Sequence, residues 1–185
     1  MSFKNKAELK EVQEKDLKLI LDWRNQEWIR DCMYNREVIS MEQHLKWFEK
    51  LQKSETSISR IFYYGGIPYG ILNVNDIDKV NKRCEWGFYI GSEDALRGMG
   101  TILGFTSLNY IFNHIPVRKI CAEVIGSNKK SISFHRKMGF VQEGLLRKQI
   151  VRDGLDVDIV LYGMFKEEWS KKSARIQMKI EGRYV

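Results

Sequence analysis

The stretch Leu96-Arg97-Gly98-Met99-Gly100-Thr101 decides the fold, because it joins two segments of different periodicity. Residues 84–90 before it form a short apolar run typical of a strand, and the apolar stripe of residues 101–113 after it predicts a helix. A glycine-rich turn of this kind directs several backbone N–H groups and the positive end of the helix to one point. The turn therefore favours a pyrophosphate site, although on its own it fits a plain strand-to-helix connection equally well.

Two residue types in this turn suit an anionic ligand. Gly98 and Gly100 allow a close approach of the backbone, and Arg97 adds a fixed positive charge with forked donors. The pattern is not a P-loop, because no Gly-Lys-Ser/Thr follows it. It is not the dinucleotide fingerprint either, since that motif needs three glycines at a different spacing.

The segments downstream of the turn continue the alternation of strand and helix. Residues 119–125 are mostly apolar and predict a strand, and a helix is expected to begin near Asn128 and to end at Gly139. Two extended runs within residues 141–165 then flank Asp153-Gly154, which is a strong hairpin signal.

The first half of the chain predicts two helices and an antiparallel hairpin. Residues 16–25 carry an apolar stripe of helical spacing, and Ser40-Met41-Glu42-Gln43 is a capping-box pattern that opens a second helix. Residues 58–64 and 69–74 are interpreted as strands joined by a turn at 65–68. Together with an opening strand, these segments predict an α/β fold with a mixed sheet.

The order of strand, Arg-Gly-x-Gly turn, helix, strand, Asn-capped helix and hairpin resembles the GCN5-related N-acetyltransferase (GNAT) superfamily. Arg97-Gly98-Met99-Gly100 resembles its Arg/Gln-x-x-Gly-x-Gly/Ala signature, with Ile102 where the signature ends in Gly or Ala. Residues 128–140 resemble its Asn…Tyr-x-x-x-Gly-Phe segment, with His135 at the Tyr position. The resemblance implies a mixed, mostly antiparallel twisted sheet flanked by helices, with two central parallel strands that splay apart.

A second set of residues resembles the UDP-aminosugar N-acetyltransferases of pseudaminic acid biosynthesis. The set comprises Asp22-Trp23-Arg24-Asn25, Arg30, Met33-Tyr34, Ile39-Ser40, His44-Leu45, Trp47-Phe48, residues 84–91 and Glu143-Gly144. This resemblance implies an acetyl-CoA-dependent enzyme that acetylates the 4-amino group of a UDP-4-amino-4,6-dideoxy-N-acetylhexose by direct transfer in a ternary complex. The product would feed a nonulosonic acid used in flagellin glycosylation.

The resemblance also implies which residues bind acetyl-CoA, in the strand, the turn and the cap of the later helix. They are Phe88, Tyr89, Ile90, Arg97, Gly98, Met99, Gly100, Thr101, Ile102 and Asn128. In the family, the amides near residues 88–90 pair with the pantetheine arm, and the Tyr89 or Ile90 amide faces the thioester oxygen. Gly87 in the middle of the strand agrees with a close backbone approach.

Acetyl transfer needs a neutral amine, a polarised thioester and a proton for the departing thiolate. His135, at the Tyr position of the family, is the candidate general acid, because a histidine near neutral pKa is a capable donor. Tyr162 and Tyr89 are the alternative donors. Glu85, in the strand beside the thioester, is the candidate base, acting through a water. The competing interpretation is a packing role for His135 and a structural or surface carboxylate for Glu85.

Five residues of the first half are candidates for binding the acceptor: Trp23, Arg24, Arg30, His44 and Trp47. An aromatic face can stack on a uracil, arginines can hold the diphosphate, and the histidine can hydrogen-bond the sugar or the diphosphate. The competing interpretation is core packing for the tryptophans and surface charge for the arginines.

The composition fits one domain of an ordinary globular protein. The chain has 185 residues, 43% of them hydrophobic, with no apolar run of the roughly 20 residues that cross a membrane. Its first 16 residues are charged and unlike a signal peptide. The three cysteines, Cys32, Cys84 and Cys121, are not clustered, and there are only three histidines. This usage favours reduced thiols in the cytoplasm and argues against a metal site.

The net charge of +7 is concentrated at the end of the chain. Against Glu181, residues 171–185 contain five basic residues, a local net charge of +4: Lys171, Lys172, Arg175, Lys179 and Arg183. We therefore expect a single acetyltransferase domain over residues 1–169 and a basic C-terminal tail over residues 170–185, either a disordered arm or a dimer contact. The mildly positive body suits anionic small ligands such as CoA and a nucleotide-sugar, rather than nucleic acid or a membrane, and leaves a homodimer open.

Other functions stay open at this point. The same chemistry could act on a protein N-terminus, as in the ribosomal-protein alanine acetyltransferases, or on a polyamine. The grouping of Arg24, Arg30 and His44 has the wrong sign for a polyamine pocket. A non-catalytic acyl-CoA sensor or an RNA-associated basic protein is the alternative outside enzymology, and the charge distribution argues against the RNA form.

Overall fold

The computed structural model of the chain describes residues 3–184. Within these residues, seven strands form one sheet in the order β1-β2-β3-β4-β5-β7-β6. The strands are β1 (Ala7–Glu11), β2 (Ile58–Tyr64), β3 (Ile67–Asp78), β4 (Arg83–Ile90), β5 (Lys119–Ile125), β6 (Val141–Arg152) and β7 (Leu155–Phe165). Neighbouring strands are antiparallel, except that β4 and β5 are parallel. The predicted α/β fold with a mixed, mostly antiparallel sheet is confirmed.

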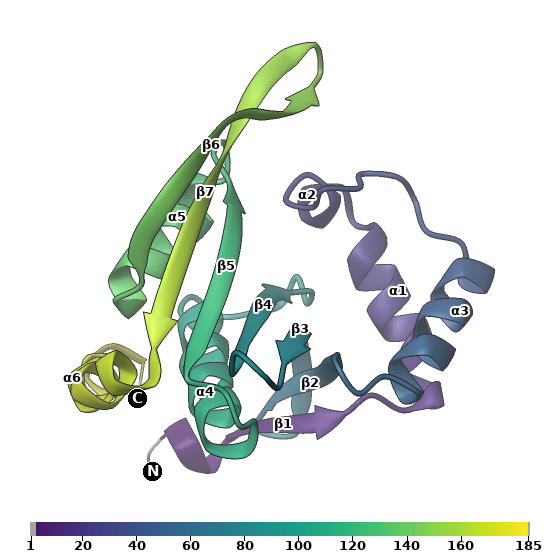
Figure 1. The fold of residues 1–185 in the computed structure, drawn as a ribbon. Helices are drawn as coiled ribbons and strands as arrows, with labels where there is room; N and C mark the ends of the chain where they lie inside the picture. Colours follow the sequence, from purple (N-terminus) through teal and green to yellow (C-terminus); the bar gives the residue numbers. More distant parts are fainter. Residues whose placement is uncertain (1–2, 185) are drawn as a thin grey trace.

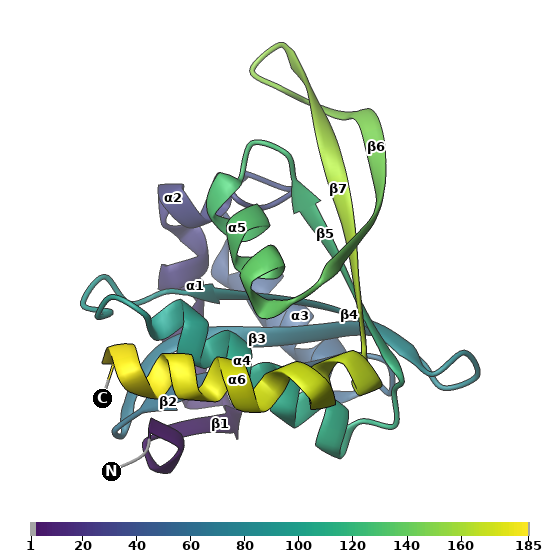
Figure 2. The same ribbon diagram turned by 90° about the vertical axis from the view of Figure 1, so that its left-hand side faces the viewer.

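Helices cover both faces of the sheet (Figure 1, Figure 2). One face carries α1 (Leu17–Asn25), α2 (Glu27–Arg30) and α3 (Met41–Gln52). The other face carries α4 (Met99–His114), α5 (Lys129–Met138) and α6 (Lys166–Tyr184). Two short 3-10 helices, Phe3–Asn5 and Glu14–Asp16, flank β1. The sequence pattern did not indicate α2, because four residues carry too little periodicity to be recognised.

The two parallel strands diverge soon after they meet. Their pairing comprises only Arg83↔Lys119, Cys84↔Ile120 and Glu85↔Cys121. Beyond these pairs, β4 runs on beside β3, while β5 runs on beside β7. Figure 1 shows β5 leaving β4 and rising toward the β6–β7 hairpin. The predicted splay is confirmed, and in the described structure it leaves one edge of β4 without a strand partner from residue 86 onward.

Side-chain caps place the two helices whose starts were predicted. Asn128 accepts a hydrogen bond from the Ser131 N–H at 3.0 Å at the start of α5. Gly139 ends that helix with a φ of 91°, a left-handed conformation that favours glycine. Ser40 and Gln43 form the expected capping box at the start of α3. These short-range signals were correct because they depend on neighbouring residues alone.

The first hairpin turns earlier than the sequence suggested. Gly65-Gly66 alone joins β2 to β3, and both glycines have a positive φ. Pro68 therefore lies inside β3, opposite Tyr63 and beside a bulge in β3, where Tyr69 is the extra residue. A proline is tolerated there because a bulge leaves ladder hydrogen bonds unmade.

Two apolar clusters hold the layers together. The larger lies between the sheet and the helices α4, α5 and α6, and its fully buried members include Leu72, Leu103, Leu108 and Ile120. The smaller joins α1 and α2 to the sheet through Ile20, Trp23, Ile29, Ile61 and Ile71. Burial of one such side chain contributes about 1.5–3 kcal/mol. The larger cluster thus joins the strands on both sides of the splay, and the smaller one packs on the strands β2 and β3.

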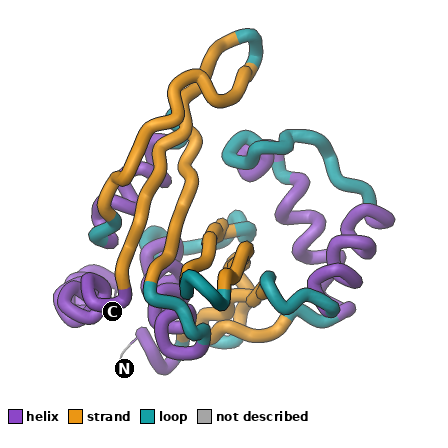
Figure 3. The backbone as a smooth tube through the Cα atoms, viewed as in Figure 1, coloured by secondary structure: helices purple, strands orange, loops and turns teal. Residues whose placement is uncertain are grey.

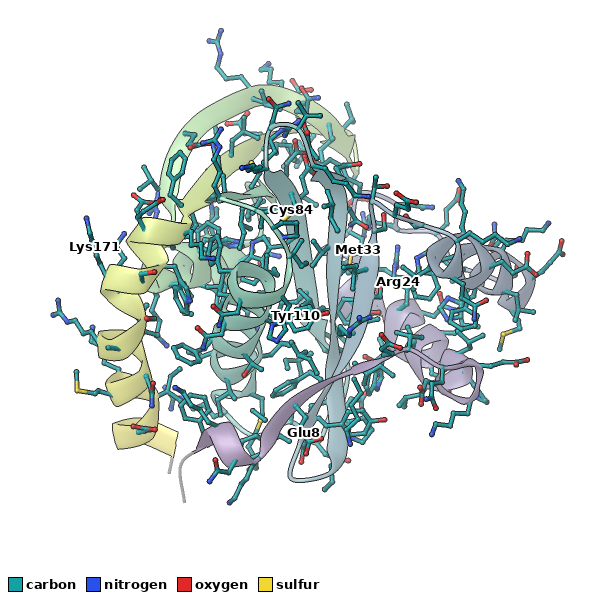
Figure 4. All side chains as sticks on the ribbon, turned by 60° about the horizontal axis from the view of Figure 1, so that its bottom comes forward. Glu8, Arg24, Met33, Cys84, Tyr110 and Lys171 are labelled. Atoms are coloured by element: carbon teal, nitrogen blue, oxygen red, sulfur yellow. The ribbon has the colours of Figure 1, made fainter. Side chains whose placement is uncertain are left out.

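The last helix, α6, corrects the prediction of a separate basic tail. Trp169 and Ile180 are 3% and 2% exposed and belong to the larger cluster. The Trp169 Nε1–H also donates to Asn109 Oδ1 on α4 at 2.9 Å. Figure 2 shows α6 lying against α4, and Figure 4 shows Lys171 pointing away from the body. The predicted boundary between residues 169 and 170 falls inside this packed helix, and Val185 lies outside the described residues.

Candidate active site

The glycine-rich turn presents backbone donors that the fold does not use. Gly98 has a φ of 104°, and α4 begins at Met99. Among residues 3–184, no backbone oxygen accepts a hydrogen bond from the N–H of Gly98 or of Gly100. Met99 and Ile102 turn their side chains into the core, at 4% and 1% exposure, so they offer a ligand only their backbone. The turn can therefore hold an anion with N–H groups and the positive helix end.

Gly100 and Gly104 lie one helical turn apart and have different roles. A Cβ at Gly100 would meet only Ile90 Cγ1, at 3.8 Å. A Cβ at Gly104 would lie 2.3 Å from Phe134 Cζ, so the packing of α4 against α5 requires glycine there. Since protein packing does not require glycine at position 100, the space beside it is available to a ligand.

A depression of about 450 Å³ lies between the start of α4 and α5. Its lining is Thr101, Lys129, Lys130, Ser133, Phe134 and Lys137. The Lys137 Nζ lies 3.3 Å from Thr101 Oγ1, which places a cation at the first turn of α4. Sequence reasoning missed these lysines, although Lys130 and Lys137 are seven residues apart and so share one helix face. Lysines beside free N–H groups suit a ligand with several phosphates.

Two predicted cofactor residues are placed differently from the rest. Asn128 uses its side-chain oxygen to cap α5, so in this geometry it positions the helix. Arg97 is exposed on the turn, and its contact with a phosphate stays a prediction.

The end of β4 presents alternate sides to the two clusters. Phe88 and Ile90 pack toward the larger cluster, and Tyr89 packs toward the smaller one. Burial raises the pKa of the Tyr89 phenol above its usual value. The backbone of this segment pairs with β3 on one side only, so its other edge can pair with the amides of a pantetheine arm. The roles of these three residues in cofactor binding stay predictions.

Two carboxylates, Glu123 and Asp76, act on a third, Glu85, at the start of the splay. Burial raises the pKa of Glu85, and the charges of Glu123 and Asp76 raise it further. Glu123 lies on β5, two residues beyond the Cys121 that pairs with Glu85, and it accepts a hydrogen bond from Tyr34 Oη at 2.5 Å. A carboxylate with a raised pKa is suited to take a proton from an amine. Sequence reasoning missed Glu123, although strand alternation puts it on the same face as Cys121.

His135 occupies a packing position, which argues against the predicted general-acid role. Its side chain is 6% exposed, and its ring stacks on Tyr162 with 5.3 Å between centroids. Its Nδ1 lies 2.8 Å from the Ser131 carbonyl oxygen, and because a carbonyl only accepts, Nδ1 carries the proton. Burial lowers the pKa of His135 to about 4, so at neutral pH the ring is neutral and Nε2 bears a lone pair. An imidazole in that state accepts a hydrogen bond and is a poor proton donor to a thiolate.

Two buried polar atoms beside His135 have no partner in the described part of the chain: Tyr162 Oη and Trp86 Nε1. The Trp86 ring meets the His135 ring edge to face, at 5.9 Å between centroids. Buried O–H and N–H groups normally have acceptors, so a ligand or a water is expected to supply them here. Tyr162, the alternative donor from the sequence, thus has an O–H that the fold leaves unused.

The two arginines predicted to hold a diphosphate mainly hold the loop after α2. Arg30 donates from Nε to Asn25 O at 3.1 Å and from Nη1 to Arg36 O at 2.8 Å. Arg24 donates from Nη2 to Asn35 O at 2.8 Å, but its buried Nη1 has no acceptor among the residues described. Figure 4 shows Arg24 on the side of the strands that α1 covers. Arg30 is therefore a structural residue in this geometry, whereas Arg24 keeps one donor for a ligand.

The aromatic candidates for acceptor binding differ in burial. Trp23 is 5% exposed in the smaller cluster, and a Cβ at Gly91 would collide with its ring. His44 is 4% exposed and stacks on Trp47 at 4.9 Å, and burial lowers its pKa. Core packing therefore describes Trp23 and His44 in this structure. Trp47 is only partly buried and is the most accessible of the three, and its contact with an acceptor stays a prediction.

Neither a metal site nor a membrane span is found in residues 3–184. No group of three or more His, Cys, Asp or Glu side chains in this range could hold a metal ion. The same range contains no helix long and apolar enough to cross a membrane.

Comparison with known proteins places the chain in a family. The sequence matches the family described as an acetyltransferase (GNAT) domain over residues 9–161. The chain therefore belongs to the GNAT acetyltransferase family, whose members use acetyl-CoA. The unused amides at the start of α4, the open space at Gly100 and the lysine-lined depression fit that molecule.

Proteins similar to the chain include acetyltransferases with different names. It is 31% identical over 108 residues to the putative ribosomal N-acetyltransferase YdaF of Bacillus subtilis, a match that spans 57% of this chain and only 58% of the relative. It is 26% identical over 130 residues to the acetyltransferase PseH of Campylobacter jejuni, spanning 70% of this chain and 80% of the relative. Spermidine N-acetyltransferase from Vibrio cholerae, solved with CoA and spermine, matches with a TM-score of 0.84 at 18% identity, over 90% of this chain and 99% of that chain. The last likeness establishes the fold, not the acceptor.

Proposed function

We propose that the protein transfers the acetyl group of acetyl-CoA to the 4-amino group of a UDP-4-amino-4,6-dideoxy-N-acetylhexose. The observation that supports this acceptor is the buried Nη1 of Arg24, which has no partner in the described residues. A buried guanidinium N–H without an acceptor is costly, and an anionic group would satisfy it. A nucleotide-sugar carries a diphosphate that can do so, whereas a polyamine carries no anion. The likeness to PseH points the same way.

The proposed reaction uses both sides of the splay. Acetyl-CoA lies with its pyrophosphate at the glycine-rich turn and its thioester beside β4. Glu85 takes a proton from the 4-ammonium group, directly or through a water, which frees the nitrogen lone pair. The amine attacks the thioester carbonyl carbon, and the N–H of Tyr89 or Ile90 stabilises the oxyanion. The C–S bond then breaks, the attacking nitrogen gives up its second proton to water, and the thiolate takes one proton from a donor that water reprotonates.

The proton for the thiolate is assigned to Tyr162 in place of His135. The phenol O–H is a donor, and the fold leaves it buried without a partner beside the His135 ring. His135 Nε2 bears a lone pair, so it can accept a hydrogen bond from a group of the bound cofactor. His135 is therefore a positioning residue in this scheme.

A polyamine is the second candidate acceptor. The charges of Glu123 and Asp76 both act on Glu85, and three neighbouring carboxylates attract a polycation. The Vibrio cholerae protein of the same fold was solved with spermine. The carboxylates do not favour a polyamine over an aminosugar by themselves, because either acceptor brings an ammonium group.

A thiol-release assay with acetyl-CoA separates the acceptors. The acceptors are UDP-4-amino-4,6-dideoxy-N-acetyl-β-L-altrosamine, spermidine and a peptide with an N-terminal alanine. We expect fast release with the nucleotide-sugar alone. Preference for spermidine would establish the second candidate, and preference for the peptide would establish a protein N-terminal acetyltransferase. Acetyl-CoA binding without release on any amine would point to an acyl-CoA sensor.

The substitution Arg24→Gln tests the observation that supports the acceptor. We expect the KM for the nucleotide-sugar to rise at least tenfold, while the KM for acetyl-CoA stays unchanged. Arg118→Gln, which alters an exposed arginine just before β5, is the matched control and should change neither value. An Arg24→Gln variant with an unchanged KM for the nucleotide-sugar would remove the support for a diphosphate at this position.

A further inference from the structure

The loop that follows α2 crosses from the helices α1 and α2 to the strands β5, β6 and β7, on the other side of the splay. We call its residues 31–36 the strap. Figure 3 traces this loop between α2 and α3, and Figure 4 shows Met33 beside the strands. In the chain, the strap connects α2 to α3, which lie in the acceptor half. Its contacts, however, are with β5 and with the β6–β7 hairpin.

Two side chains of the strap reach across the splay. Tyr34 Oη donates to Glu123 Oε2 on β5 at 2.5 Å. Arg36 Nη1 pairs at 3.0 Å with Asp153 Oδ2, at the tip of the β6–β7 hairpin. Both contacts are solvent-exposed and individually weak, so they form a fastening that can open. We call these two contacts the latch.

The strap backbone is held in place by arginines from both walls. Arg152, in the β6–β7 hairpin, donates to the carbonyl oxygens of Asp31 and Met33. Arg24, on α1, donates to the Asn35 carbonyl oxygen at 2.8 Å. A segment whose carbonyls are bound from both sides has a defined path across the splay, rather than a free loop conformation.

The latch lies close to the proposed base. The charges of both Glu123 and Glu85 act on the Tyr34 phenol, and the charge of Glu123 acts on Glu85. The Tyr34–Glu123 contact therefore lies within electrostatic reach of Glu85, where the proposed reaction brings the acceptor amine.

We propose that the latched strap determines the class of acceptor: it admits a small amine and excludes the N-terminus of a peptide or protein, which needs an open cleft. Tyr34 and Asp153 are thus specificity-determining residues, and neither takes part in the chemistry. The inference rests on the proposed acetyl transfer and deepens it, because it restricts the acceptor to small molecules.

The test opens the latch without changing the reacting groups. Tyr34→Phe removes the hydroxyl and keeps the ring, and Asp153→Asn removes the charge at a φ of 51°, which asparagine tolerates. We expect the double variant to acetylate an N-terminal alanine peptide at least tenfold faster than the wild type does. Its kcat/KM for the preferred small amine should stay within about threefold. Glu37→Gln, which removes a charge just beyond the strap, is the control and should change neither rate.

Hydrogen exchange of the amides in residues 31–36 provides a readout that does not depend on activity. We expect exchange to be faster in the double variant than in the wild type and in Glu37→Gln. Unchanged exchange would overturn the latch, because these contacts would then not hold the strap. Faster exchange with an unchanged peptide rate would overturn the specificity role, as would a wild type that already acetylates the peptide as fast as the variant. If no amine is acetylated by any form, the proposed function fails, and the exchange data still report on the latch.

Discussion

The cofactor side and the acceptor side of the splay are built in different ways. The cofactor side is built from two short contiguous segments, the turn at 96–101 and the capped helix α5, and the turn and the caps each depend on neighbouring residues. The acceptor side depends on contacts such as Tyr34–Glu123 and Arg36–Asp153, whose members are 89 and 117 residues apart in the chain. The first kind of site can be recognised in a sequence, and the second is created only by folding.

The largest expected effects are at Gly100 and Gly104, which lie on the same helix, α4, of the cofactor side. They test whether the turn at 96–101 is a ligand site. Gly100→Val places a side chain in the space left for the ligand, so we expect the KM for acetyl-CoA to rise about 100-fold, equivalent to roughly 2.7 kcal/mol. The melting temperature should be almost unchanged, because a Cβ at residue 100 meets only Ile90 at 3.8 Å.

The matched variant Gly104→Ala should behave in the opposite way. Its Cβ would collide with Phe134 at 2.3 Å, so we expect a loss of about 1–3 kcal/mol in the free energy of unfolding. A chemical denaturation series and acetyl-CoA titrations on both variants measure the two effects. Loss of stability in Gly100→Val with no change in KM would show that the turn is a plain connection.

The same contrast explains what the sequence could predict. The turn, the Asn128 cap and the Gly139 stop were placed correctly because their signals are local. The helix α6 was not predicted because the many basic residues of this segment indicated an exposed tail. Its apolar stripe, which includes the buried Trp169 and Ile180, was overlooked. The stripe has helical spacing, but its burial depends on α4, which is distant in the sequence.

Acceptor residues are harder to recognise in a sequence for a physical reason. A sequence does not distinguish arginines that donate to backbone carbonyls, as Arg30 does, from arginines that bind a phosphate. In the sequence Glu123 is an isolated carboxylate, and only the pairing of β4 with β5 brings it within electrostatic reach of Glu85. His135 was assigned a proton from its position in a motif, but the surrounding aromatic rings decide its protonation state.

The next prediction concerns His135 and how the free energy of unfolding depends on pH. Its pKa falls from the usual 6.5 to about 4 on folding, so the unfolded chain binds the proton more readily. The stabilisation is therefore complete above about pH 6.5 and is lost as the pH falls toward 4, by up to roughly 3 kcal/mol. Urea unfolding at pH 7 and pH 4.5 should show a smaller loss for His135→Phe than for the wild type. His44 titrates in both proteins, so the difference between them isolates His135.

Activity separates the two roles considered for this histidine. If His135 positions the cofactor, His135→Phe should retain kcat within about tenfold and should keep the shape of the wild-type pH profile. A loss of 10²-fold or more, together with a changed basic limb, would restore the general-acid role. Tyr162→Phe is the complementary variant, and it should lower kcat more than His135→Phe does.

The smallest expected effect concerns Glu123, on the acceptor side. It separates the effect of the Glu123 charge on Glu85 from the hydrogen bond that Glu123 accepts from Tyr34. Glu123→Gln removes a negative charge that raises the pKa of Glu85, so the acid limb of the pH profile of kcat should move to lower pH. Asp76 continues to raise that pKa and Arg83 to lower it, so the limb moves without disappearing. Glu85→Gln, in contrast, should abolish the limb along with most of the activity.

Glutamine at position 123 still offers an oxygen to the Tyr34 hydroxyl, so the strap stays latched in Glu123→Gln and the peptide should still be excluded. Tyr34→Phe has the opposite consequence, since it weakens the fastening and leaves the charge of Glu123 in place. The two variants should therefore differ in kind, one in the pH profile and the other in the range of acceptors. If both variants moved only the pH profile, Tyr34 would act through the carboxylates, and the restriction to small amines would have to come from elsewhere in the acceptor half.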